Sequence, residues 1–107
     1  MRDLIIKCVE AANGWQFIPK HQFVKIPGFT EPANIMRLNP VTRDALAAQL
    51  IRQIDESDNF SFKQNKHGRA VVVNSKPKTG QPMRASANDG CRTITALKVI
   101  EASGFIR

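Results

Sequence analysis

The feature that most constrains the fold is a double change of hydrophobic period in the last two-thirds of the chain. Residues 40–56 carry apolar side chains at helical spacing, and Asn39 and Pro40 suit the N-cap and the first helical position. The period then changes to two, first in FSF and next in the β-branched run AVVV. It returns to helical spacing over residues 91–103, a helix that Asn88 or Asp89 can cap. Two helices enclosing short strands predict an α+β fold.

The N-terminal third adds a further helix and short extended pieces. Residues 2–13 form one apolar stripe that stops at an Asn-Gly pair. The sequence WQFIPKHQFVKIPG predicts one or two short strands, which Pro19 interrupts and Pro27-Gly28 ends. Residues 29–39 read as irregular, although residues 35–38 can extend. We therefore expect residues 1–107 to form a single α+β domain in the order α-β(-β)-α-β-β-β-α. Its helices should pack on one face of a small antiparallel sheet.

The N-terminus and the cysteines predict a cytoplasmic protein. The start, MRDLIIKCVE, has an acid at Asp3 and no long apolar run, so we expect no secretory signal. No stretch approaches the roughly 18 apolar residues of a membrane span. The two cysteines, Cys8 and Cys91, form no CxxC pair and lie in helical patterns. We expect both to be reduced, buried thiols.

Nearly all of the net charge lies in one short segment. The chain has a formal net charge of +7, and residues 1–62 contain seven basic and seven acidic residues. Residues 63–92 contain seven basic residues and one acid, which gives +6 of the +7. Such crowding of like charge is typical of a surface that meets a polyanion. The predicted nucleic-acid contacts are the basic residues of this segment and its histidine: Lys63, Lys66, His67, Arg69, Lys76, Lys78, Arg84 and Arg92.

The leading hypothesis is a non-enzymatic module that binds DNA or RNA through phosphate contacts of the basic segment 63–92. The backbone N–H groups at the start of the last helix would add to the affinity for anions. Two alternatives stay open: the segment is a solvated face without a partner, or it meets an acidic protein. The sequence separates neither DNA from RNA nor single from double strands.

Catalysis receives little support from the sequence. His21 and His67 could serve a small ribonuclease of the toxin type as general acid or base. However, the sequence contains no metal-ligand spacing, nucleophile elbow or phosphate-cradling glycine loop. We therefore predict no catalytic residue, no metal and no cofactor. Because aromatic residues are few, we also assign Phe60, Phe62 and Trp15 to the core rather than to base stacking.

Three resemblances bear on function. Residues 40–103 resemble the α-β-β-β-α topology of the double-stranded-RNA-binding domain, whose hairpin loop and last helix contact RNA. That resemblance implies RNA contacts for His67 in NKHGR and for Arg92 in NDGCRT. The start, LIIKCVEAANGWQF followed by His21 and Phe23, is similar to HicA-type mRNA interferases.

The third resemblance is to small phage-encoded α/β sandwich proteins. Helix 40–56, strand 69–74 and the sequence ITALKVIEASGF look like that pattern, which covers about the last two-thirds of the chain. The resemblance implies an accessory protein of a phage or mobile element. Such a protein would bind and inhibit an acidic partner or a host defence complex.

Overall fold

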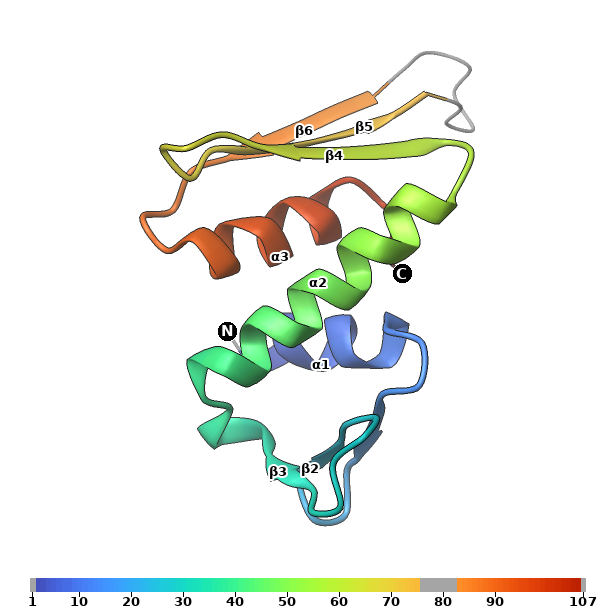
Figure 1. Cartoon of the computed structure of the whole chain (residues 1–107), viewed down its shortest axis with the longest axis vertical. Helices are drawn as coiled ribbons and strands as arrows, with labels where there is room; N and C mark the ends of the chain where they lie inside the picture. The colour runs from blue at the N-terminus through green and yellow to red at the C-terminus, as the bar shows by residue number, and fades with distance from the viewer. Residues whose placement is uncertain (1, 76–82, 107) are drawn as a thin grey trace.

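The computed structural model describes residues 2–75 and 83–106 and has the expected α+β architecture (Figure 1). Over these residues it contains three α-helices and two three-stranded antiparallel sheets. The N-terminal elements are α1 (Arg2–Ala11), β1 (Gln16–Ile18), β2 (Phe23–Lys25), β3 (Ala33–Asn34) and the 3-10 turn η1 (Ile35–Arg37). The C-terminal elements are α2 (Pro40–Glu56), β4 (Phe60–Gln64), β5 (Ala70–Asn74), β6 (Met83–Ala87) and α3 (Arg92–Ala102).

The helices lie between the two sheets. In Figure 1 the β4-β5-β6 sheet lies above α2 and α3, and the β1-β2-β3 sheet lies at the opposite end beyond α1. We expected a single sheet, whereas β1 pairs with β2 and β2 pairs with β3, and among the described residues none of these strands joins the β4-β5-β6 sheet. Within the described ranges, the two C-terminal helices cover one face of the β4-β5-β6 sheet, and no element covers its other face.

Helix α2 begins at Pro40, directly after the predicted N-cap residue Asn39. The Asn39 side chain accepts a 2.8 Å hydrogen bond from the backbone N–H of Thr42, as an N-cap residue does. Leu46, Leu50 and Ile54 follow at helical spacing and are completely buried. Burying such a stripe supplies most of the stability of a helix of this length.

Strand alternation sends β4 and β5 side chains to opposite sides of the sheet. Phe60 and Phe62 face the helices and pack against the core, as predicted, and Val72, opposite Phe62, is fully buried. Phe105, which follows α3, packs against β4: its ring lies edge-on to that of Phe60, with centroids 5.1 Å apart. Trp15 also packs against the core.

Three local expectations were wrong. Neither Asn88 nor Asp89 caps α3, whose N-cap position is Cys91 without a side-chain hydrogen bond. Cys91 is exposed rather than buried, whereas Cys8 is buried as expected. Residues 35–37 form a 3-10 turn instead of extending, because the side chain of Asn34 accepts the N–H of Met36 and starts the turn.

No helix in residues 2–75 or 83–106 is both long enough and apolar enough to cross a membrane.

Candidate nucleic-acid interface

The uncovered face of the β4-β5-β6 sheet, here called the outer sheet face, is where much of the basic segment lies. With Phe62, Val72 and Ala85 aligned toward the helices, the residues between them point the other way. The pairing register aligns Lys63 with Val71 and Ser86, and Ser61 with Val73 and Arg84. These six residues form the outer sheet face: Ser61, Lys63, Val71, Val73, Arg84 and Ser86.

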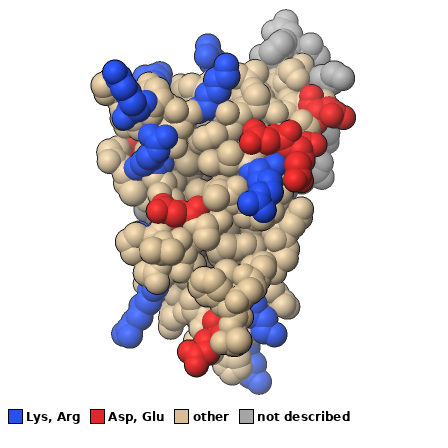
Figure 2. Space-filling view, in the orientation of Figure 1, with Lys and Arg blue, Asp and Glu red and all other residues tan. Residues whose placement is uncertain are grey.

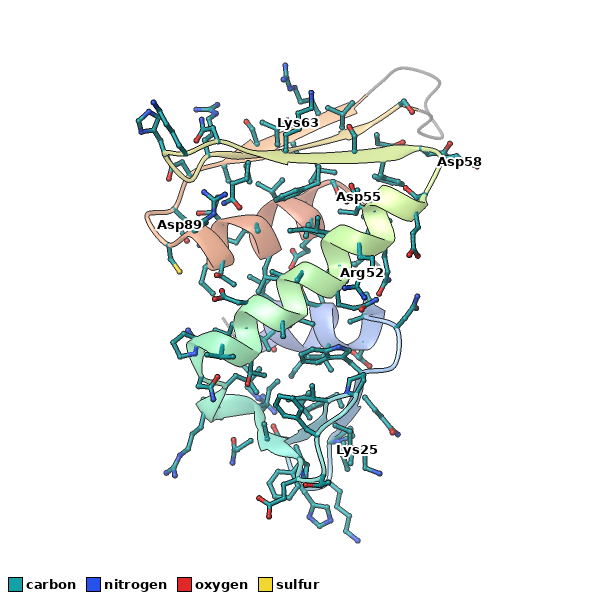
Figure 3. The ribbon with its side chains drawn as sticks, viewed as in Figure 1. Lys25, Arg52, Asp55, Asp58, Lys63 and Asp89 are labelled. Carbon is teal, nitrogen blue, oxygen red and sulfur yellow. The ribbon has the colours of Figure 1, made fainter. Side chains whose placement is uncertain are left out.

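A shallow hollow occupies the middle of the outer sheet face. It has a volume of about 180 Å³ and is lined by the side chains that surround the middle strand: Ser61, Lys63, Val71, Val73 and Arg84. Lys63 and Arg84 belong to the two edge strands and lie diagonally across β5, and both are exposed. Figure 3 shows Lys63 projecting from the sheet on the side away from the helices. The hollow thus combines an apolar floor with two cations at its sides.

Arg69 extends the positive charge beyond the hollow toward the hairpin turn. It precedes β5, is exposed, and places Nη2 3.4 Å from the hydroxyl oxygen of Ser86. Contacts of this length are weak, so this one occupies little of the hydrogen-bonding capacity of the guanidinium.

The turn that joins β4 to β5 carries two more of the predicted residues, Lys66 and His67. Both are exposed. The side-chain oxygen of Asn65 accepts the backbone N–H of His67 at 2.9 Å and that of Arg69 at 3.1 Å. Gly68 has φ +91°, a conformation that glycine adopts without steric cost. The turn is therefore an ordered platform for the two side chains.

Arg92 forms a hydrogen bond within the protein, at the end of the sheet where the β4–β5 turn lies. Its Nη1 donates a 2.9 Å hydrogen bond to the backbone carbonyl oxygen of Asn65. The side-chain amide of Gln64 donates to the carbonyl oxygens of Gly68 and Arg92, each at 2.9 Å. The start of α3 is thereby joined to the hairpin, and part of the Arg92 donor set is used within the protein.

The structure therefore brings six of the eight predicted residues to adjoining surfaces. Lys63, Arg69 and Arg84 lie on or beside the outer sheet face, and Lys66, His67 and Arg92 lie at its hairpin end. Lys76 and Lys78 lie outside the described residues. Val71 and Val73 were not among the residues predicted for this surface. Their outward direction follows from the period of two once Val72 is known to be buried.

Acidic side chains lie apart from the outer sheet face. Figure 2 shows basic side chains along the upper edge and left of the molecule, and a group of acids on the upper right. Asp55 and Asp58 lie there, near the C-terminal end of α2 (Figure 3). Asp89 forms a 2.5 Å ion pair with Lys98 of α3. Among the described residues, the outer sheet face contains no acid.

The two histidines do not share a site. His21 precedes β2 in the N-terminal sheet, with its ring centroid 5.8 Å from that of Phe23. His67 lies in the β4–β5 turn of the other sheet. In the part of the chain that the structure describes, no group of three His, Cys, Asp or Glu residues is placed to hold a metal ion.

Comparisons with protein-family models, with curated proteins and with solved structures find no match to this chain.

Proposed function

We propose that the protein binds nucleic acid through the outer sheet face and the adjoining hairpin turn. The observation that carries the proposal is an uncovered sheet face that contains cations and no described acid. Lys63, Arg69 and Arg84 would contact phosphates, and Lys66 and His67 would extend the contact along the strand. Arg92 would act mainly by holding the hairpin in place.

Phosphate contacts explain why cations would gather on one surface. Each cation that neutralises a phosphate releases condensed counterion, so the association constant falls steeply as salt rises. Flexible lysine and arginine side chains need only charge and reach for such contacts. The expected binding is consequently tight at low salt and tolerant of sequence.

A second candidate is an acidic protein partner, such as a host complex inhibited by a mobile-element protein. The apolar pair Val71 and Val73 with a charged surround favours it, because protein interfaces commonly have an apolar centre and a polar rim. A pulldown before and after nuclease digestion separates the two candidates. A protein partner captured equally after digestion supports this second candidate, and capture that is lost on digestion supports nucleic acid.

Two variants with equal loss of charge test the proposal. The first changes Lys63, Arg69 and Arg84 to Gln. The second changes Lys7, Lys20 and Lys25 to Gln. These three lysines are exposed and lie in α1 and the N-terminal sheet region. Figure 3 shows Lys25 at the end of the molecule opposite Lys63.

Binding of both variants to fluorescein-labelled DNA and RNA is followed by anisotropy between low and physiological salt. The slope of log K against log [salt] should fall in magnitude by about 2 to 3 in the first variant, since each of the three lost phosphate contacts removes about 0.7 to 0.9. The second variant should retain most of the slope. Equal losses in both variants, or no binding by the wild type at low salt, would refute the proposal.

A further inference from the structure

The outer sheet face offers more than charge, because its centre is apolar. Val71 and Val73 are successive outward residues of β5, and both line the hollow and are partly exposed. Alternate residues of a strand lie about 6.6 Å apart. Lys63 flanks the first valine and Arg84 flanks the second, on opposite sides of β5. An occupant would therefore meet an apolar floor with a cation on either side.

A duplex cannot use this floor. Its bases are paired and stacked, and their edges are reached through grooves. The major groove, about 12 Å wide, admits a helix or a two-stranded ribbon. The broad face of a three-stranded sheet reaches only the phosphates outside. Over a duplex the two valines would lie against charged backbone, and their burial would gain nothing.

A single strand can use the floor and both cations. Its unpaired bases can turn an apolar face to the protein while the phosphates on either side remain free to meet Lys63 and Arg84. Open sheet faces bind unpaired bases in this manner, usually through aromatic side chains. Here the platform is aliphatic, since Phe60 and Phe62 point to the core. The contact should therefore be weaker than aromatic stacking and indifferent to which base is present.

We infer that the ligand of the outer sheet face is single-stranded nucleic acid, with an unpaired base over Val71 and Val73 and its flanking phosphates at Lys63 and Arg84. This inference rests on the proposed function and restricts it to one class of nucleic acid. The hairpin turn with Lys66 and His67 would contact the strand where it leaves the hollow.

The test compares a labelled 12-nucleotide single strand of mixed sequence, as DNA and as RNA, with the corresponding 12-base-pair duplexes at low salt. The informative variant is Val71→Thr with Val73→Thr, which keeps the branched shape and strand propensity while making the floor polar. The matched control is Val41→Thr, because Val41 is 73% exposed at the start of α2, away from the sheet. Unchanged thermal unfolding would show that the variants are folded.

We expect the single strand to bind more tightly than the duplex. The double valine variant should lose about fivefold in single-strand affinity with an unchanged salt slope, because no phosphate contact is removed. Duplex affinity and the Val41→Thr control should not change.

Equal binding of duplex and single strand, or no effect of the valine changes, would overturn the inference while the proposed function stands. Absence of binding to every strand by the wild type would overturn both.

Discussion

The guanidinium of Arg92 donates a 2.9 Å hydrogen bond to the backbone carbonyl oxygen of Asn65, 27 positions earlier in the chain. This contact joins the first residue of α3 to the turn between β4 and β5. The side chain of Gln64 reinforces it with a 2.9 Å bond to the carbonyl oxygen of Arg92. The position of the basic turn relative to the helix is thus set by contacts of the proposed interface itself.

Replacing Arg92 should affect stability more than salt-dependent binding. Arg92→Met removes the donor to Asn65 and keeps an unbranched side chain, so the free energy of unfolding should fall by about 1 kcal/mol. The salt slope of nucleic-acid binding should fall less than in Lys63→Gln. Urea unfolding and anisotropy titrations measure the two effects. Arg37→Met, at an exposed position in η1, is the control, and an equal destabilisation there would contradict the assigned role.

The two cysteines should differ in reactivity. Cys8 is completely buried, and burial, with a smaller contribution from the charge of Glu101, raises its pKa to about 12. Cys91 is exposed. Because the thiolate is the reactive form, a thiol reagent at neutral pH should modify one cysteine of the native protein and both after denaturation. Cys91→Ser should abolish the native reaction, and fast labelling that persists in that variant would place Cys8 within reach of solvent.

Cys8 should also make the protein less stable in alkali. Its pKa rises from 9.0 to about 12 on folding, so between these values the unfolded chain releases a proton that the folded chain keeps. Its contribution is complete below pH 9 and is lost as the pH rises toward 12, by roughly 1.4 kcal/mol per pH unit. Cys8→Ala should flatten this part of the stability profile relative to Cys91→Ala. Urea unfolding measures the free energy of unfolding at each pH. If it changes with pH equally in Cys8→Ala and Cys91→Ala, the pKa of Cys8 does not cause the loss of stability in alkali.

The edge-on contact between Phe60 and Phe105 should couple the chain end to β4. A double-mutant cycle with Phe60→Leu and Phe105→Leu keeps apolar side chains and removes the ring pair. We expect a coupling energy of about 1 kcal/mol, since aromatic pairs contribute about 0.5–1.5 kcal/mol beyond burial. Chemical unfolding of the four proteins measures it. Strictly additive effects would mean that each ring acts only by filling space.

The local elements of this fold were predictable because their signals are local. Asn39 and Pro40 lie at the start of the helix that they favour. The strand pattern of FSF and AVVV depends only on neighbouring residues. The concentration of positive charge in residues 63–92 is likewise a property of the chain alone.

The shortest local signals were misleading where another nearby side chain competed for the same group. Asp89 was expected as a possible cap of α3, yet its side chain pairs with Lys98 and its N–H donates to the hydroxyl of Thr95 at 2.9 Å. Thr95 and Lys98 lie in the first two turns of α3, and their contacts with Asp89 compete with capping by the Asp89 side chain. Only the folded geometry determines which of these contacts forms.

The sequence by itself determined the class of the fold, the helix α2 and its cap, the β-branched strand and the place of the charge along the chain. Only the tertiary structure decided that the strands form two sheets, that Cys91 faces solvent, and that Val71 and Val73 lie between Lys63 and Arg84 on the outer sheet face. The physical reason is that the alternation of apolar and polar residues shows which side chains lie on the same side of a strand, but not which side is buried. Which side remains open depends on where α2 and α3 find room to bury their apolar stripes.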